Sequence, residues 1–215
     1  MARTWQTPVA TMGFYSDQIL PRLTHLAMST VETTRQRKQA LAGVAGEVLE
    51  LGIGSGLNLP HYPPGVRRVV GVEPSVTAAR MAEKRIQKAG FPVEIVSGGA
   101  ESVFVDEDRF DAVVSTFTLC TIPDVAGALA TVRRALKPGG RFFFLEHGLS
   151  GEPRVQTWQR RLEPLQRRVG GGCHLTRDPR ALIESAGFAI SGLETFYAQG
   201  PRPFSFLYRG VGAVR

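Results

Sequence analysis

Short apolar runs alternate with helix-like segments along the middle of the chain, and this alternation restricts the fold more than any other feature. The runs with the composition of buried strands span residues 47–51, 68–72, 93–96, 110–115 and 141–146. Helical patterns at 76–89 and 125–136 lie between them and end at Gly90 and at residues 137–140. Repeated strand–helix–strand spacing predicts a parallel sheet that helices cover on both faces.

The flanking segments complete the predicted architecture. Residues 15–42 have a mainly helical pattern, in which Pro21 is the candidate break. After the core come a basic helix, a short helix over 179–186 and two β-rich stretches, 188–197 and 204–213, which predict a hairpin. We therefore expect a doubly wound α/β fold with a mostly parallel seven-stranded sheet, an antiparallel C-terminal hairpin and an N-terminal helical extension.

Composition favours a globular protein in a reducing compartment. The 215 residues suffice for one domain, and 43% of them are hydrophobic and 21% charged. No run of about 18 apolar residues predicts a transmembrane helix, and the first residues do not read as a signal peptide. Two cysteines, Cys120 and Cys173, cannot form a disulfide framework, so we expect a cytoplasmic protein.

The net charge of +7 makes nucleic acid a candidate partner. The basic residues, however, lie in scattered short clusters, such as 35–38, and do not alternate with stacking aromatic residues. No RNA-binding or helix-turn-helix signature is evident. Most of these charges are therefore expected on solvated faces, and nucleic acid is not the predicted partner.

A glycine-rich turn follows the first strand, with Gly52, Gly54 and Gly56 in alternate positions. Such glycines permit positive φ and let a ligand approach the main chain. The pattern E-x-G-x-G-x-G differs from the dinucleotide fingerprint G-x-G-x-x-G, and the prolines that follow leave little helix to face a pyrophosphate. Glu50, just before the turn, would repel phosphate but attract a cation.

Glu73 ends the second strand, 23 residues after Glu50. An acidic residue at about this spacing binds the two hydroxyls of a ribose. A nucleoside that also carries positive charge suits both carboxylates. S-adenosylmethionine (SAM), with its sulfonium and amino groups, is therefore the predicted ligand.

Four motifs in this order resemble the class I SAM-dependent methyltransferases, which implies a Rossmann-like fold. They are VLELGIGSGLNLP, VVGVEPS, FDAVVSTFTLCTIPD and VRRALKPGGRFFFLEH. The stretches TFTLCTIPD, FFFLEHG and GGCHLTRD further resemble the small alkyl-thiol S-methyltransferases. Animal members of that group carry a hydrophobic N-terminal membrane anchor that this sequence does not show, so membrane residence is not expected.

The resemblance implies a single methyltransferase domain with four parts. These are a helical extension, a cofactor-binding core, substrate-capping helices and C-terminal strands, at residues 1–44, 45–150, 151–187 and 188–215. The core would bind SAM and release S-adenosylhomocysteine. Gly52, Gly54 and Gly56 would line the methionine part of SAM, Glu50 would lie near its amino end, and Glu73 would hold its ribose.

Further residues of the core are assigned to the cofactor site by the same resemblance. They are Asn58, Pro74, Ala100, Glu101 and Thr116. Thr116 would present its carbonyl oxygen to the reactive methyl group. Ala100 and Glu101 would contact the adenine, because Gly99 stands where many relatives have an acidic residue.

The acceptor is expected to be a small molecule, with a thiol as the leading candidate. A free thiol has a pKa near 8.5, so it needs little help to become the thiolate nucleophile. His147, at the end of the fifth strand, is the predicted proton acceptor; the alternative is a histidine satisfied by neighbouring backbone. Cys173 and His174 are further catalytic candidates. They lack the second Cys/His pair that a metal site needs, so no metal is predicted.

The glycine-rich loop around Cys173 is predicted to cap the substrate pocket. Arg177 and Asp178 would form an ion pair or a helix cap there, and Asp178 before Pro179 suits an N-cap. Cys120 is expected to serve core packing rather than chemistry.

Residues 154–169 combine an apolar stripe at helical spacing with arginines that lie mostly off it. The favoured interpretation is an insertion helix that packs Trp158 over the active site. The alternative is a surface helix in weak contact with anionic lipid, which would suit phospholipid N-methylation or another N- or O-methylation. A non-catalytic cofactor-binding regulator is a third, remote alternative.

Overall fold

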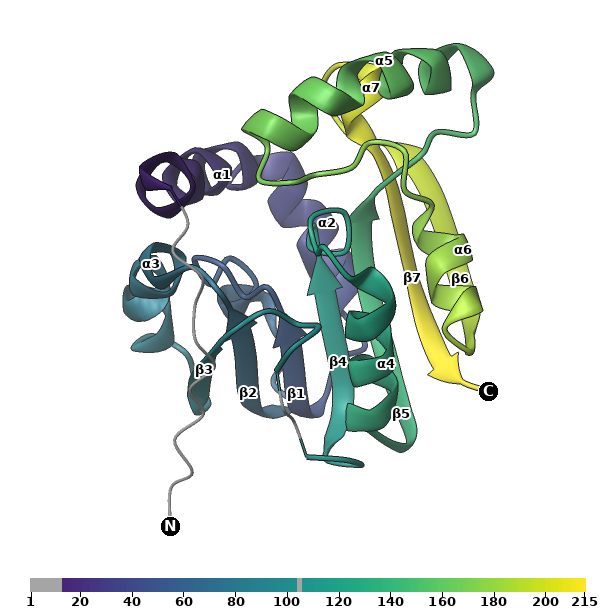
Figure 1. Ribbon diagram of the computed structural model, residues 1–215. Coiled ribbons are helices and arrows are strands. Elements are labelled where there is room, and N and C mark those ends of the chain that lie inside the picture. Colours follow the sequence, from purple (N-terminus) through teal and green to yellow (C-terminus); the bar gives the residue numbers. More distant parts are fainter. Residues whose placement is uncertain (1–12, 104–105) are drawn as a thin grey trace.

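The computed structural model describes residues 13–103 and 106–215, so the start of the predicted N-terminal extension lies outside the described part. In that part, seven strands form one sheet in the order β3-β2-β1-β4-β5-β7-β6. They are β1 (Gly46–Leu51), β2 (Val66–Glu73), β3 (Val93–Ser97), β4 (Phe110–Thr116), β5 (Leu136–His147), β6 (Phe188–Tyr197) and β7 (Phe206–Val214). β7 runs antiparallel to β5 and β6, and the other pairs are parallel. The predicted fold class is confirmed (Figure 1).

Helices cover both faces of this sheet, as its buried strands require. The first face packs against α2 (Val31–Leu41) and α3 (Val76–Ile86), and the second against α4 (Val125–Ala135) and α6 (Pro179–Ser185). A side-chain oxygen caps the N-terminus of each of these helices, and the four capping residues are Thr30, Ser75, Asp124 and Asp178. Asp178 is thus the helix cap that the sequence indicated.

Three consecutive phenylalanines of β5 show how a central strand serves two cores. Phe142 and Phe144 are buried in the core that α4 and α6 cover, and Phe143 is buried in the core that α2 covers. Successive side chains of a strand point to opposite faces of its sheet. A continuous apolar run is therefore what a strand covered on both sides needs.

Several element boundaries differ from the prediction, and two of the differences have a clear physical reason. The N-terminal helical segment breaks at Ser29, between α1 (Leu20–Met28) and α2, whereas Pro21 lies in the first turn of α1, where its missing N–H costs no hydrogen bond. The helix predicted over 125–136 ends at Ala135, and Leu136 already pairs with Phe110 of β4. A register shift between β4 and β5 follows this pair, and the extra residues, 137–140, belong to β5.

The carboxyl-terminal ends of the parallel strands lie beneath α1 and α5 (Pro153–Val169) (Figure 1). The hydroxyl of Tyr15, in the single π-helical turn η1 (Tyr15–Ile19), donates to the carbonyl oxygen of Val169 at 2.7 Å. The N-terminal helices and the segment after the core therefore meet above the end of the sheet where ligands bind in such folds.

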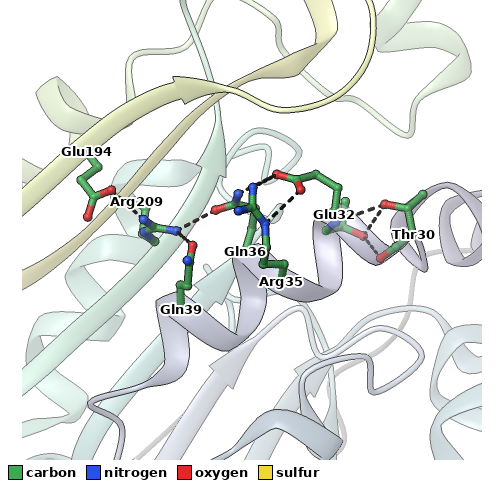
Figure 2. Close-up of polar contacts among 8 residues, drawn as sticks. Thr30, Glu32, Arg35, Gln36, Gln39, Glu194 and Arg209 are labelled. Atoms are coloured by element: carbon green, nitrogen blue, oxygen red, sulfur yellow. Dashed lines mark hydrogen bonds and ion pairs between the residues drawn. The ribbon is translucent and has the colours of Figure 1, made fainter.

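Polar contacts fix α2 to the C-terminal strands (Figure 2). Arg209 of β7 donates to the side-chain oxygens of Gln36, at 2.6 Å, and Gln39, and it pairs with Glu194 of β6 at 2.6 Å. The next residue after Gln36, Arg37, is buried with 6% of its surface exposed. Anchoring α2 in this way places a guanidinium inside the protein.

Candidate functional site

A cavity of about 290 Å³ lies at the carboxyl-terminal ends of β1, β2 and β4. β1 and β4 are the neighbours at which the strand order reverses, which is the usual ligand position in doubly wound sheets. Strand ends and the glycine turn supply one wall of the cavity; His25 and Met28 of α1 supply another, and Gly171 closes it from the loop after α5. The N-terminal extension is thus part of the cavity.

The glycine turn depends on its glycines for its backbone shape. Gly52, Gly54 and Gly56 have φ values of 61°, 57° and 76°, in the left-handed region that other residues rarely adopt. A Cβ atom on Gly52 would lie 2.6 Å from side-chain atoms of Thr118. The turn therefore exposes main-chain atoms to the cavity without side chains in the way.

Glu73 joins the end of β2 to this turn. Its two carboxylate oxygens accept backbone N–H groups from Gly54 and Ser75, each at 2.8 Å. Burial raises the pKa of Glu73, and the two hydrogen bonds oppose that rise. Each oxygen keeps a lone pair, so the carboxylate can accept two further hydrogen bonds from a ligand.

Glu50 and Arg37 form the polar floor of the cavity. Glu50, 1% exposed, accepts hydrogen bonds from the Asn58 amide at 2.7 Å and the Tyr62 hydroxyl at 2.8 Å. Arg37 donates to the Asn58 side-chain oxygen at 2.9 Å and to the Thr116 hydroxyl at 2.7 Å. The buried Nε of Arg37 has no hydrogen-bond partner among the described residues. Burial raises the pKa of Glu50 to about 7 and lowers that of Arg37 to about 10.

The raised pKa of Glu50 predicts how stability depends on pH. Between its ordinary value of 4.5 and about 7, Glu50 holds its proton in the folded chain and loses it in the unfolded one. The folded state then binds more protons, so the free energy of unfolding falls as pH rises through this window, by up to about 3 kcal/mol from this group. Burial raises the pKa of Glu146 to about 7 as well, which adds a contribution of the same sign.

Urea unfolding of the wild type and of Glu50→Gln from about pH 5 to pH 7 measures this effect. Glutamine keeps the volume and cannot ionise, so the variant should lose the part of the slope that Glu50 supplies while Glu146 retains its own. Equal slopes for the two proteins would show that Glu50 is already ionised at pH 5 in the folded state.

A second cavity, about 350 Å³ in volume and mainly apolar, adjoins the first. His147, Cys120 and Cys173 line it, and both cavities touch Phe117 and Thr121. Phe117 has a φ of 56°, an uncommon conformation for a residue other than glycine, and its ring lies 5.2 Å from the Arg37 guanidinium carbon. The two chambers therefore meet at a residue whose backbone is held in a sparsely populated state.

His147 ends β5 with 7% of its surface exposed, and neither ring nitrogen has a hydrogen-bond partner among the described residues. A buried polar group without a partner is costly, so an unpaired imidazole beside a cavity indicates a place for a ligand. The preceding residue, Glu146, serves structure instead. It accepts the backbone N–H groups of Thr118 and Leu119, at 2.9 and 3.0 Å, and thereby holds the turn that carries Phe117.

The loop after α5 delivers Cys173 to this second cavity. Gly171 and Gly172 have φ values of 63° and 84°, which lets the chain reverse after the helix. The backbone N–H of His174 then donates to the carbonyl oxygen of Cys120 at 2.8 Å. The His174 ring turns away to Glu163 of α5, with Nδ1 3.0 Å from the carboxylate oxygen.

Comparisons with known proteins place the chain in a family. A family model of the methyltransferase domain matches residues 49–144. Thiol S-methyltransferase TMT1B of Rattus norvegicus is 39% identical over 178 residues, which cover 78% of this chain and 69% of that protein. The chain belongs to the thiol S-methyltransferase family. Thiol S-methyltransferase TMT1A of Homo sapiens is 34% identical over 170 residues, 76% of this chain and 68% of that one.

The fold of this thiol S-methyltransferase family member is shared more widely. A SAM-dependent methyltransferase of Thermotoga maritima superposes with a TM-score of 0.67 at 20% identity, over 94% of this chain and 98% of that one. The resemblance inferred from the four sequence motifs is thereby confirmed.

The two cavities bring together eight of the thirteen predicted site residues. Glu50, Gly52, Gly54, Glu73, Pro74 and Thr116 line the first, and His147 and Cys173 line the second. The others, which line neither cavity, are Gly56, Asn58, Ala100, Glu101 and His174. Asn58 still acts on the site through Glu50, whereas His174 is directed to Glu163.

Two expectations about side chains are corrected, and the role of the Thr116 carbonyl stays a prediction. That oxygen accepts the hydroxyl of Thr118 at 3.1 Å and keeps a second lone pair, while the Thr116 hydroxyl joins the buried network. Trp158 does not pack over the site, since 54% of its surface is exposed. Arg177 forms no ion pair with Asp178; it donates to the carbonyl oxygens of Leu119 and Ile122, at 2.5 and 2.8 Å.

Arg37, His25 and Phe117 are site residues that the sequence did not reveal. Arg37 stands in a basic run that is typical of a solvated face, and nothing in its spacing marks it as buried. His25 lines the first cavity and its Nδ1 lies 2.8 Å from the Ser55 hydroxyl. Within the described residues no cluster of three or more His, Cys, Asp or Glu side chains is arranged to hold a metal ion, and no helix is long and apolar enough to cross a membrane.

Proposed function

We propose that this protein transfers the methyl group of SAM to a small thiol. The observation that carries the proposal is the adjoining pair of chambers, one with two buried carboxylates and the other apolar with an unpaired imidazole. The first suits SAM: Glu73 offers acceptors for a ribose diol, and the unpartnered Nε of Arg37 offers a donor for a carboxylate. Glu50, whose pKa is raised to about 7, offers a cationic end a carboxyl group that is ionised above that pH.

SAM, when bound, supplies an electrophilic methyl group on a sulfonium. The residues of this chain orient and protect the reaction. Glu73 fixes the ribose, and Glu50 and Arg37 fix the methionine end. Phe117 and Met28, which line both chambers, exclude water where donor and acceptor meet. A ring nitrogen of His147 accepts the thiol proton. Cys173, which lines the same chamber, stabilises the imidazolium that results, because interaction with the Cys120 side chain lowers the pKa of Cys173 to about 5 against the effect of burial.

The direct test is an assay with tritium-labelled SAM methyl groups across a small alkyl thiol, an amine, a phenol and phosphatidylethanolamine vesicles. Label in the thiol is the expected result. If the label appeared only in the lipid, or only in the amine and phenol, those molecules and not the thiol would be the methyl acceptors. SAM binding without transfer to any acceptor would favour the non-catalytic regulator.

We also propose that the mouth of the acceptor chamber rests on an anionic lipid surface. Leu23 of α1, Val169 of α5 and Phe204 line the chamber, and each exposes between 41 and 50% of its surface. Trp158 and Leu165 continue this apolar strip along α5 at 54 and 60% exposure. Helical spacing puts Arg154, Arg161 and Arg168 along one side of the strip, which is the pattern of an interfacial helix.

Sedimentation with vesicles tests this contact. We expect binding to vesicles with phosphatidylserine, little binding to pure phosphatidylcholine, and release at high salt. Leu165→Ser should weaken binding, whereas Val76→Ser, at a similarly exposed apolar position on α3, should not. Equal losses for the two variants, or no binding to anionic vesicles at low salt, would contradict the proposal. The compartment in this proposal remains the reducing cytoplasm, because two cysteines cannot form a disulfide framework.

A further inference from the structure

The acceptor chamber contains both cysteines of the chain, and they come from different segments. Cys120 lies in the turn after β4, and Cys173 in the glycine loop after α5. The backbone hydrogen bond from His174 to the carbonyl oxygen of Cys120, at 2.8 Å, holds the two segments against each other. The two thiols are free and line the same cavity. Core packing alone would explain one buried thiol, but not two thiols from different segments that line one ligand cavity.

The two cysteines differ in pKa and in exposure, as the two cysteines of a thiol–disulfide exchange site do. Interaction with the Cys120 side chain, with smaller contributions from His147 and Gln166, lowers the pKa of Cys173 to about 5, although burial opposes this. The same interaction and burial raise the pKa of Cys120. Of the two, Cys173 is the more exposed, and Cys120 exposes only 4% of its surface. A reachable thiolate beside a buried protonated thiol is the arrangement of an attacking and a resolving cysteine.

We propose that Cys173 and Cys120 form a thiol–disulfide exchange site that accepts the small disulfides of the same thiols the chamber admits. The Cys173 thiolate attacks one sulfur of R–S–S–R; a Cys173–S–S–R bond forms and R–S⁻ leaves with the electron pair of the broken bond. Cys120 then loses its proton to His147 or solvent and attacks the Cys173 sulfur. The Cys120–Cys173 disulfide forms and a second R–S⁻ leaves. The protein pair is oxidised and the small disulfide is reduced to two thiols.

The exchange links methyl transfer to the redox state of the acceptor, and this consequence rests on the proposed function. Oxidation removes the Cys173 anion beside His147 and ties the glycine loop to the β4 turn. We therefore expect the oxidised protein to transfer no methyl groups. An excess of free R–S⁻ reverses both steps and restores the reduced pair.

The chemical step is tested without SAM. The wild type, reduced with a phosphine that carries no thiol, is incubated with bis(2-hydroxyethyl) disulfide, and intact mass and free thiols are measured. We expect a mass loss equal to two hydrogens, no free thiol and no retained adduct. Cys120→Ser should stop at one mixed disulfide on Cys173, and Cys173→Ser should react far more slowly at Cys120. A wild type that stays unreacted, or that keeps a stable adduct without the internal disulfide, would overturn the proposal. Since that result comes from the unmodified chain, it does not depend on how well either variant folds.

A parallel assay separates this proposal from the proposed function. Transfer from labelled SAM to a small thiol is measured for protein that is reduced, oxidised and then reduced again with the phosphine. Loss in proportion to the oxidised fraction, and full recovery, is expected. Activity that persists in fully oxidised protein would refute the regulatory consequence. Exchange without any thiol methylation would refute the proposed function and support the exchange site. Methylation without exchange would refute the exchange site and support the proposed function.

Discussion

Glu73→Ala is expected to weaken SAM binding by about 1.5–3 kcal/mol, or roughly 10- to 150-fold. The substitution removes the acceptor for two ribose hydroxyls, and charge-assisted hydrogen bonds in a buried site are among the stronger ones. It also leaves the backbone N–H groups of Gly54 and Ser75, which lie 2.8 Å from the carboxylate, without their acceptor, so the glycine turn loses one of its hydrogen bonds to the end of β2. Both effects act on the free energy of binding in the same direction.

Titration calorimetry with SAM measures the loss. Glu94→Ala is a matched control, because Glu94 is also a strand carboxylate but pairs with Arg68 at 2.6 Å outside the cavity. Its affinity should equal that of the wild type. If Glu73→Ala bound SAM as tightly as the wild type, Glu73 would have no place in the cofactor site. NAD should not bind either protein, since the short 3₁₀ turn Leu59–His61 follows the glycines in place of a long helix.

The sequence predicted the sheet because buried strands have few alternatives. Phe142, Phe143 and Phe144 can all be buried only in a strand with cores on both sides, and the capping residues Ser75 and Asp124 mark helix starts by local chemistry. The strand ends then place Glu50 and Glu73 at one edge of the sheet without further information.

The chamber walls could not be predicted in the same way, because tertiary packing decides them. Arg37 looks like a surface residue until Arg209 anchors the opposite side of α2. Trp158 has the spacing of a buried residue but remains exposed, since the buried side of α5 is formed by Val155 and Gln159. His174 stands next to Cys173, yet neighbours in an extended loop point different ways, and its ring goes to Glu163.

His147→Ala is expected to lower kcat/KM for a small thiol by about 100-fold or less near neutral pH. A positioned base contributes about 10²- to 10⁴-fold in general, but a thiol is already a few per cent ionised at pH 7, which limits what a base can add. The loss should shrink as pH rises above the thiol pKa near 8.5, because solvent then removes the proton. SAM affinity should change little, since His147 lines the second cavity and not the first.

The measurement is kcat/KM from about pH 6 to pH 9.5, under conditions where chemistry limits the rate. His174→Ala separates the two neighbouring candidates: its ring is held by Glu163 outside both cavities, so any loss it causes should be independent of pH. If the loss of kcat/KM depended on pH in His174→Ala but not in His147→Ala, His174 and not His147 would be the proton acceptor. If the ratio of variant to wild-type kcat/KM did not change with pH for either variant, His147 would shape the chamber and the thiol would reach it already ionised. In that case the contacts at Phe117 and Arg37, which align donor and acceptor, would account for the protein's share of the catalysis.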